Sequence, residues 1–252
     1  MSAVYRRPAG TARTIGQSLR IYHGDKSKHA GMDALYARFL KPGALAFDIG
    51  SHVGDRISSF RRLGARVVAL EPQPACARAI RLIHGRDPSV VLVQAACGAN
   101  AGHVTLRINS ANPTVTTASD AFVAAAAGAG GWEDQIWDHS VEVPCVTLDG
   151  LIVTHGLPDF IKIDVEGFEL SVLEGLNQRP AALSFEFTTI QKDVALACLG
   201  RLAALGSYRF NIALGESQSL TFGTPVDRTA MAAHIEALPH AANSGDVYAV
   251  LG

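Results

Sequence analysis

Residues 44–55, Ala-Leu-Ala-Phe-Asp-Ile-Gly-Ser-His-Val-Gly-Asp, decide the fold of this chain. The apolar run at 44–49 holds a single acid, Asp48, as expected for a parallel β-strand covered on both faces. Gly50 permits a tight turn and a close approach of the backbone to a ligand, and Gly54 lets the next helix pack against the strand. The stretch predicts a strand, a turn and a helix at a ligand-binding edge, although a turn without a ligand has the same pattern.

The residues of the turn favour a cationic ligand over a dinucleotide. Pyrophosphate-binding turns carry Gly-x-Gly-x-x-Gly, whereas His52 occupies the position of the middle glycine here. Asp48 instead places a carboxylate beside the turn. A carboxylate suits the amino-acid half of S-adenosylmethionine (SAM).

A second acid supports an adenosine-type cofactor. Residues 66–71 form another apolar strand that ends at Glu71, followed by Pro72 and Pro74, which constrain the turn. Nucleotide-binding α/β units place an acid for the ribose hydroxyls about 20 residues after the first glycine. Glu71 lies at that distance from Gly50. A solvated glutamate at a strand end is the alternative interpretation.

Composition sets the class of protein. The chain has 252 residues, 48% of them hydrophobic and 18% charged, which fits one large globular α/β domain. The net charge of −1 indicates no general attraction to nucleic acid or to an anionic membrane. Four cysteines without Cys-x-x-Cys spacing predict neither a zinc site nor a disulfide framework. No stretch has the length of a membrane span, so we expect a cytoplasmic protein.

Strands alternate with helices along the chain, which predicts a doubly wound, mostly parallel, Rossmann-like sheet of about seven strands with an antiparallel C-terminal edge. The predicted strands are 44–49, 66–71, 89–93, 103–109, 141–146, 158–164, 182–187, 208–214 and 246–251. The predicted helices are 32–40, 56–63, 75–84, 148–156, 165–173, 194–205 and 231–238.

Three segments define the expected domain organisation. Residues 1–40 are predicted as an N-terminal arm followed by a helix that covers the cofactor end, and residues 41–252 as the catalytic domain. Within the arm, residues 18–22 suit a short strand or a cover. Residues 110–140 are Thr-rich and then Ala/Gly-rich, and an internal connection of this length is usually functional or mobile. We expect a substrate lid there, with a surface insertion as the alternative.

Acidic residues recur where the predicted strands end. Because ligands of open α/β sheets bind beyond the carboxyl ends of the strands, these acids should meet at one edge. Each alone could be a helix cap or an ion-pair partner. The group comprises Asp48, Glu71, Asp164, Glu166 and Glu186.

Four stretches together resemble one family, the FkbM methyltransferases, over about residues 40–190. They are Phe-Asp-Ile-Gly-Ser-His-Val-Gly-Asp (47–55), Val-Ala-Leu-Glu-Pro-Gln-Pro (68–74), Val-Thr-Leu-Asp-Gly-Leu (146–151) and Phe-Ile-Lys-Ile-Asp-Val-Glu-Gly-Phe-Glu (160–169). The resemblance implies a class I methyltransferase fold and SAM-dependent methylation of a hydroxyl on a sugar, glycan or secondary metabolite. Ser51 departs from the alanine or other small residue of many relatives, which is a minor change.

The resemblance also implies roles for the cofactor residues. Asp48, Gly50, Ser51 and Gly54 would line the methionine side, and Glu71 with Pro72 would lie at the ribose. Asp164 would begin the motif that faces the transferred methyl. Small residues around Ala95 would leave room for an adenine ring, although Ala-rich packing explains them equally well.

Methyl transfer is an in-line displacement, so an enzyme must align donor and acceptor, and a hydroxyl acceptor must also lose its proton. Asp164, Glu166 and His52 are the candidate bases, and Asp164 and Glu166 could alternatively be oxygen ligands of a divalent cation. No dedicated metal motif is present. We expect a small-molecule or glycan acceptor, and a homo-oligomer is compatible with the sequence.

Two other functions fit the same strand–turn–helix pattern. An NAD-dependent oxidoreductase would use Glu71 in the same way, but His52 and Asp48 count against it. A non-catalytic module that binds an adenosyl nucleotide would keep the pocket without turnover. N-methylation also stays open, because an amine needs less help with deprotonation than an alcohol.

Overall fold

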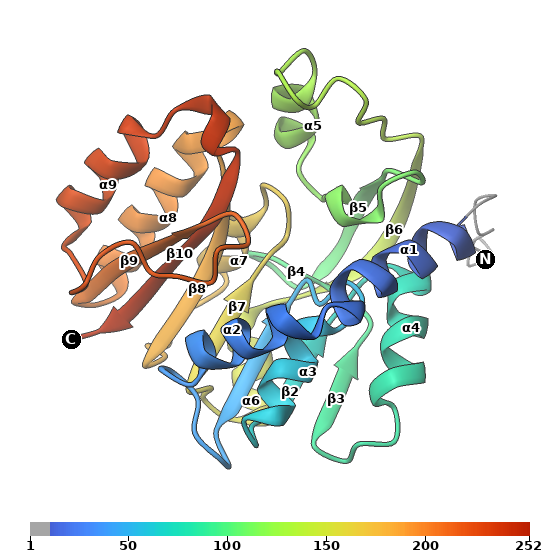
Figure 1. The fold of residues 1–252 in the computed structure, drawn as a ribbon, viewed down its shortest axis with the longest axis horizontal. Helices are drawn as coiled ribbons and strands as arrows, with labels where there is room; N and C mark the ends of the chain where they lie inside the picture. The colour runs from blue at the N-terminus through green and yellow to red at the C-terminus, as the bar shows by residue number, and fades with distance from the viewer. Residues whose placement is uncertain (1–10) are drawn as a thin grey trace.

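The computed structural model describes residues 11–252, and its centre is a seven-stranded sheet (Figure 1). The strand order is β3-β2-β1-β7-β8-β10-β9. The first five strands are mutually parallel, and β10 runs antiparallel between β8 and β9. The predicted doubly wound sheet with an antiparallel C-terminal pair is confirmed. The strands are β1 (Leu45–Ile49), β2 (Arg66–Leu70), β3 (Val90–Val93), β7 (Phe160–Ile163), β8 (Ala182–Thr188), β9 (Tyr208–Leu214) and β10 (Ser244–Leu251).

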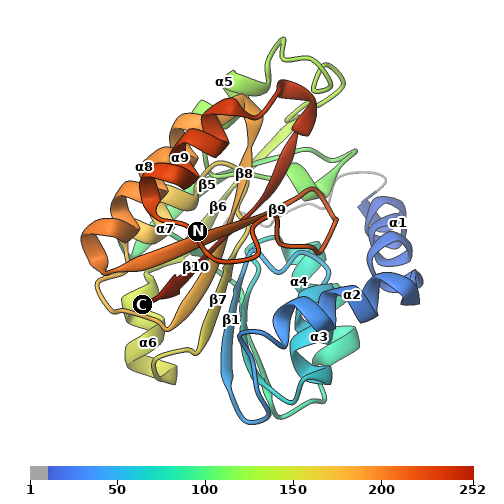
Figure 2. The same cartoon turned by 60° about the vertical axis from the view of Figure 1, so that its left-hand side comes forward.

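Helices cover both faces of this sheet (Figure 2). On one face α2 (Lys26–Tyr36), α3 (Asp55–Arg62) and α4 (Pro74–His84) pack on Ala46, Val67 and Phe160. The other face carries α6 (Leu148–His155), α7 (Glu169–Glu174), α8 (Lys192–Leu205) and α9 (Arg228–Ala237), which pack on alternate residues such as Phe47 and Ile161. Both faces are therefore buried, which explains the near-continuous apolar strands.

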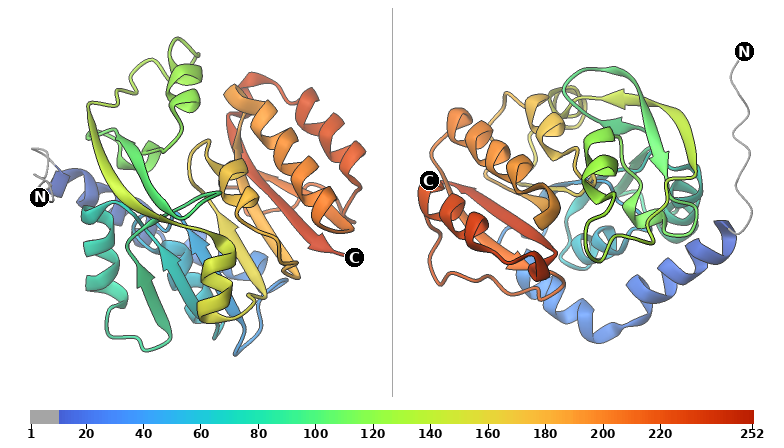
Figure 3. Two further views of the ribbon diagram at one scale, coloured as in Figure 1. Left: turned by 180° about the vertical axis from the view of Figure 1, so that it is seen from behind. Right: turned by 90° about the horizontal axis from the view of Figure 1, so that it is seen from above.

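A smaller sheet lies beside the carboxyl ends of the main strands (Figure 3). Its order is β4-β6-β5, with β4 (Ala96–Cys97), β5 (Gly102–Ile108) and β6 (His139–Val146). The alternating segments predicted at 103–109 and 141–146 are therefore strands, but they pair with each other outside the main sheet. Between them lie a 3-10 turn (Pro113–Val115) and α5 (Asp120–Ala126).

Aromatic side chains fold the segment between β5 and β6 onto itself. The Phe122 ring meets the rings of Trp132 and Trp137 edge to face, with centroid distances of 5.3 and 6.1 Å. The indole N–H of Trp137 also donates to the Val115 carbonyl at 2.8 Å. The two tryptophans thus form a small core of their own with Phe122.

The N-terminal part differs from the predicted arm. Residues 1–10 lie outside the described residues, and Thr11–Gly24 form helix α1. The helix forms because Ile15, Leu19 and Tyr22 follow one another at helical spacing and pack with Cys76 of α4. No short strand forms at 18–22.

The predicted cover helix is also displaced. Helix α2 begins at Lys26 and ends at Tyr36, so it starts earlier and ends earlier than the predicted 32–40. Its Met32, Leu35 and Tyr36 pack on the sheet and on Phe60 of α3. The residue from the N-terminal helices that faces the ligand pocket is Tyr22 of α1.

Among residues 11–252, we find no helix with both the length and the apolar character needed to cross a bilayer.

The turns after β1 and β7 are in van der Waals contact at Gly50. Gly50 has φ +87°, and a Cβ added there would lie 1.8 Å from the Asp164 carbonyl oxygen. A real Cβ never approaches an oxygen so closely. Glycine is therefore required here by the neighbouring backbone as well as by its own dihedral angle.

We expect Gly50→Ala to lower the free energy of unfolding by about 3 kcal/mol or more, because strain in φ and a backbone clash add up. Gly43→Ala is the matched control: φ is +86° and no atom lies within 4 Å of the added Cβ, so its cost should be about 1 kcal/mol. Urea denaturation of both variants measures the difference. Equal losses of unfolding free energy in the two variants would show that glycine is required at position 50 only for its dihedral angle and not to avoid the backbone clash.

Candidate active site

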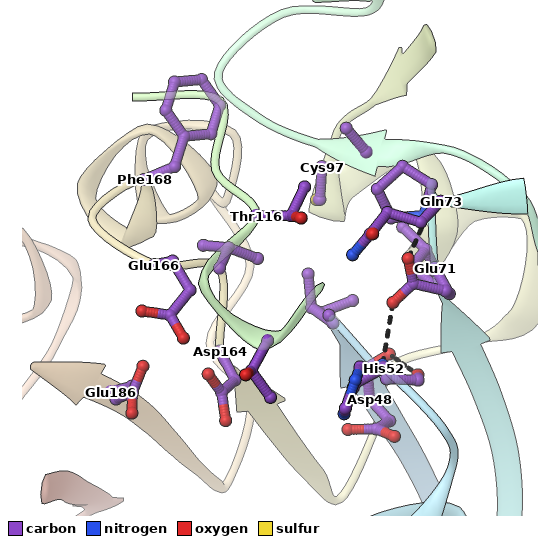
Figure 4. A pocket seen from close by; sticks show the side chains of 18 of the residues that line it. Asp48, His52, Glu71, Gln73, Cys97, Thr116, Asp164, Glu166, Phe168 and Glu186 are labelled. Atoms are coloured by element: carbon purple, nitrogen blue, oxygen red, sulfur yellow. Dashed lines mark hydrogen bonds between the residues drawn. The ribbon is translucent and has the colours of Figure 1, made fainter. Parts of the chain in front are cut away.

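One large pocket opens at the carboxyl ends of β1, β2, β7 and β8, and its empty volume, mouth included, is about 1050 Å³. Figure 4 shows Asp48, His52 and Glu71 toward one side and three further carboxylates toward the other. The pocket thus has two acidic regions.

Glu71 is held by backbone amides at the first region. Its Oε2 accepts from the His52 N–H at 2.8 Å and its Oε1 accepts from the Gln73 N–H at 2.7 Å. Burial raises the pKa of Glu71 to about 8, although these two hydrogen bonds act in the opposite direction. The carboxylate therefore has a fixed orientation, and it gains from any ligand that donates further hydrogen bonds to it.

Asp48 is the most isolated acid of the pocket. It is 1% exposed, and neither carboxylate oxygen has a hydrogen-bond partner among the described residues. Burial raises its pKa to about 7. Its backbone carbonyl accepts from the Ser51 hydroxyl at 2.8 Å, which fixes the start of the turn. A buried acid without partners is costly, so a donor or a cation supplied by a ligand would relieve it.

His52 contributes its backbone more than its ring. Its φ is +47°, which directs the N–H to Glu71. The ring packs edge-on against Tyr22 with a centroid distance of 5.3 Å, and its Nε2 has no partner among the described residues. Burial lowers the pKa of His52, so the imidazole is neutral near pH 7.

The turn after β7 forms the second region. Here Glu166 has φ +54° and Gly167 has φ +85°, so the predicted helix from residue 165 begins only at Glu169. The Glu169 carboxylate accepts from the Val165 N–H at 3.1 Å, and the Thr117 hydroxyl donates to the Glu166 carbonyl at 2.6 Å. These contacts hold a non-helical turn open toward the pocket.

Three carboxyl groups meet at this turn. Asp164, Glu166 and Glu186 each offer an oxygen within 4.8 Å of the other two. Burial and the neighbouring Asp164 raise the pKa of both Glu166 and Glu186 well above the ordinary value. Burial acts on Asp164 in the same direction, but Lys162, a hydrogen bond with Glu186 and the charge of Arg56 together hold the pKa of Asp164 below its usual value. The three neighbouring acids therefore differ in how readily they ionise.

The structure brings nearly all sequence-predicted site residues to this pocket. Asp48, Gly50, Ser51, His52, Glu71, Pro72, Ala95, Asp164 and Glu166 line it, as does Glu186. Gly54 does not line it. It is the N-cap of α3 with φ +84°, and its carbonyl contacts His84 Nε2 at 3.2 Å, so its conformation serves the packing of α3 on α4.

Other lining residues were not singled out in the sequence. Gln73 and Phe168 lie inside two of the motif stretches and could have been found there. Arg56 follows the glycine turn and is the one arginine or lysine among the described lining residues. Glu216 and Thr116 come from loops without hydrophobic periodicity, and only the folded chain shows that they reach the pocket.

The strand order and the site at the carboxyl ends define a class I methyltransferase fold. A TehB-like SAM-dependent methyltransferase from Corynebacterium glutamicum has a TM-score of 0.50, with 11% identity over 97% of this chain and 100% of that chain. An O-methyltransferase from Bacillus cereus, solved in complex with S-adenosylhomocysteine (SAH), has a TM-score of 0.48 and 12% identity over 95% and 91% of the two chains. At such identities the likeness concerns the fold alone.

The family follows from the sequence itself. The model of the methyltransferase FkbM domain matches residues 48–197, more than half of the chain. This protein belongs to the FkbM methyltransferase family. Among curated proteins, no relative matches the chain.

The protonation of the buried Asp48 side chain has a measurable effect on the stability of the fold. Its pKa is about 7 in the folded protein and 3.8 in the reference state. The folded protein thus keeps a proton that the unfolded chain releases, and stability falls as the pH rises from about 4 to about 7. Asp48→Asn removes this loss, so at pH 8 the ligand-free variant should be more stable than wild type by on the order of 2 kcal/mol.

Chemical denaturation at a series of pH values, without ligand, measures this effect. The difference between Asp48→Asn and wild type should vanish near pH 4, and the exposed Glu236→Gln control should follow wild type throughout. A variant that is equal to wild type at every pH would contradict the raised pKa.

Proposed function

We propose that this protein is a SAM-dependent O-methyltransferase that methylates a hydroxyl of a sugar, glycan or secondary metabolite. The observation that carries the proposal is the division of one pocket into two acidic regions. Glu71 and Asp48 form a region suited to a cationic nucleoside, and Asp164, Glu166 and Glu186 form a region suited to acid–base chemistry.

The first region fits SAM by its charges. Glu71 has a fixed carboxylate that can accept from ribose hydroxyls, and the unpartnered oxygens of Asp48 suit a cationic group of the methionine half. Gly50 and Ser51 are small residues of the turn after β1, so they leave space for a ligand there. Pro72 and Ala95 line the pocket beyond Glu71. SAM supplies an electrophilic methyl group on a sulfonium.

The same charges disfavour the two alternative functions. A dinucleotide would place a pyrophosphate near Asp48, which is buried and has no cation of its own among the described residues. A module that only binds the cofactor would have no use for three carboxyl groups of different charge in the adjoining region. Family membership as a methyltransferase supports the catalytic interpretation.

The acceptor would enter between the second region and the segment that follows β5. Pro113, Thr114, Thr116 and Ala118 of this segment line the pocket together with Phe168. The segment is joined to the catalytic turn by the hydrogen bond from Thr117 to Glu166. We therefore propose that residues 110–140 form the acceptor side of the site, as the part of the catalytic domain that selects the substrate.

Glu166 is the best candidate base. A general base works best when its pKa lies near the working pH, and burial together with Asp164 raises the pKa of Glu166 in that direction. Asp164 would remain charged and orient the hydroxyl or the sulfonium. His52 is neutral but packs on Tyr22 beside Glu71, which makes it less suited to reach the acceptor. A divalent cation on the three carboxylates is the alternative way to ionise the hydroxyl.

The cofactor assignment predicts the effect of Glu71→Ala on binding. Isothermal titration calorimetry should show that wild type binds SAM and SAH but not NAD. Loss of the charged hydrogen bonds to ribose should weaken SAH binding by roughly 10- to 100-fold in Glu71→Ala. Glu142→Ala, at an exposed position of β6, is the control with unchanged affinity. Binding of NAD by the folded wild type would overturn the assignment.

The proposed base predicts the effect of Glu166→Gln on turnover. Transfer of radiolabelled methyl from SAM to a panel of sugars, glycans and hydroxylated metabolites, with matching amines, would identify an acceptor. Glu166→Gln should then reduce turnover by about 100-fold or more while SAH binding changes little. Wild-type turnover should rise with pH above the ordinary carboxyl range, because the base must be unprotonated.

Two controls separate the possibilities. Glu174→Gln changes an exposed acid of α7 and should leave turnover intact. Loss of activity with a chelator and its recovery with Mg²⁺ would show that a bound cation, and not a side-chain base, ionises the hydroxyl. Unimpaired turnover in Glu166→Gln would show that a group other than Glu166 accepts the proton of the hydroxyl.

A further inference from the structure

A buried lysine lies directly behind the catalytic turn. Lys162 is 1% exposed in the middle of β7, where the two neighbouring strands place Asp48 and Ser184 beside it in register. An isolated ammonium at such a position would be very costly, so its partners must compensate for the lost hydration.

Lys162 has two carboxylate partners on different strands. Its Nζ donates to Asp164 Oδ2 at 3.0 Å and to Asp246 Oδ1 at 2.7 Å. Asp246 lies on β10, two strands away, opposite Glu186 of β8. The intervening β8 residue in register is Ser184, which is fully buried, and a small side chain there leaves room for the lysine to cross.

The two partners face different surroundings. The Asp164 side chain is 30% exposed and lines the ligand pocket, whereas Asp246 is 15% exposed and lies outside the lining of that pocket. The hydroxyl of Tyr248 also lies 3.5 Å from Asp246 Oδ2. The lysine thus links the carboxylate that faces the pocket to the antiparallel strand at the far side of the sheet.

We propose that Lys162 is a positioning residue for methyl transfer: by binding Asp164 and Asp246 together, it holds the Asp164 carboxylate in place at the pocket. The charged groups that act on Asp164 are Lys162 on β7, Glu166 on the following turn, Glu186 on β8 and Arg56 on α3. Among these, Lys162 is the cation in direct contact with it.

The geometry also favours a negative charge at Asp164. An ammonium in direct contact stabilises the ionised form of a carboxylate, and Asp164 is the one of the three adjacent acids that Lys162 contacts. The functional meaning of this arrangement rests on the proposed methyl transfer, but the charge assignment itself does not.

The test is a carboxyl titration by NMR on the full-length protein without ligand. Wild type, Lys162→Met, Lys162→Arg and Asp246→Asn would be labelled with ¹³C at the side-chain carboxyls, and Asp164→Asn, Glu166→Gln and Glu186→Gln would assign the signals. In wild type the Asp164 signal should stay ionised below the ordinary range of aspartate. In Lys162→Met its midpoint should rise by about two pH units, and Lys162→Arg should restore most of the low midpoint.

In Asp246→Asn the lysine binds Asp164 alone, so the Asp164 midpoint should remain low or fall further, and a rise in this variant can contradict the proposal even if Lys162→Met does not fold. Lys192→Met, which removes a lysine that binds backbone carbonyls at α9 instead, is the control and should leave the midpoint unchanged. A midpoint that is insensitive to Lys162→Met, or that rises in Asp246→Asn, would overturn the proposal. Neither result depends on SAM binding or on an acceptor, so failure here is distinct from failure of the proposed function.

A second readout connects the charge to function through sinefungin, an analogue of SAM with an ammonium-bearing carbon in place of the S-methyl group. At a pH between the Asp164 midpoints of the two proteins, the preference of wild type for sinefungin over SAH should exceed that of Lys162→Met severalfold, because a protonated Asp164 no longer attracts the ammonium. A purely structural lysine would affect both ligands equally. Equal preferences in the two proteins would show that Lys162 does not affect the charge that Asp164 presents to the ligand.

Discussion

The contact between Gly50 and the Asp164 carbonyl is the constraint on which the site depends. It brings the turn after β1 against the turn after β7 without an intervening side chain. The first turn carries Asp48 and, through the His52 N–H, orients Glu71. The second turn carries Asp164 and Glu166, two of the three carboxyl groups that meet there. Two backbone turns in contact therefore set the spacing between the two acidic regions of the pocket, and side-chain flexibility contributes little to it.

Excess negative charge is the second property of the pocket. Asp48 and Glu71 have raised pKa values because burial is only partly compensated by the protein. Burial of acids without partners lowers stability, so the ligand-free protein is less stable than its fold would allow. A cationic ligand returns part of that energy on binding. This argument explains why the acids are found where packing alone would favour apolar residues.

The sequence predicted the elements that depend on local pattern and missed those that depend on long-range packing. Apolar strands with acids at their ends identified β1, β2 and β7 and the pocket edge, because both faces of a parallel sheet are buried. The register that places Asp246 opposite Glu186 joins residues far apart in sequence, and no local pattern encodes it. Gly54 does not line the pocket, and it serves the packing of the following helix, which the glycine pattern also indicated.

The antiparallel strand adds a property that local motifs cannot supply. Because β10 inserts between β8 and β9, an acid from the C-terminal end of the chain reaches the lysine of the motif on β7. Lys162 is buried and Asp246 is only partly exposed, and removing either would leave the other charge without its full complement. The turn after β7 and the final strand are thereby coupled in stability and in charge. The motif that identifies the family consequently depends on a residue about 50 positions beyond the matched domain.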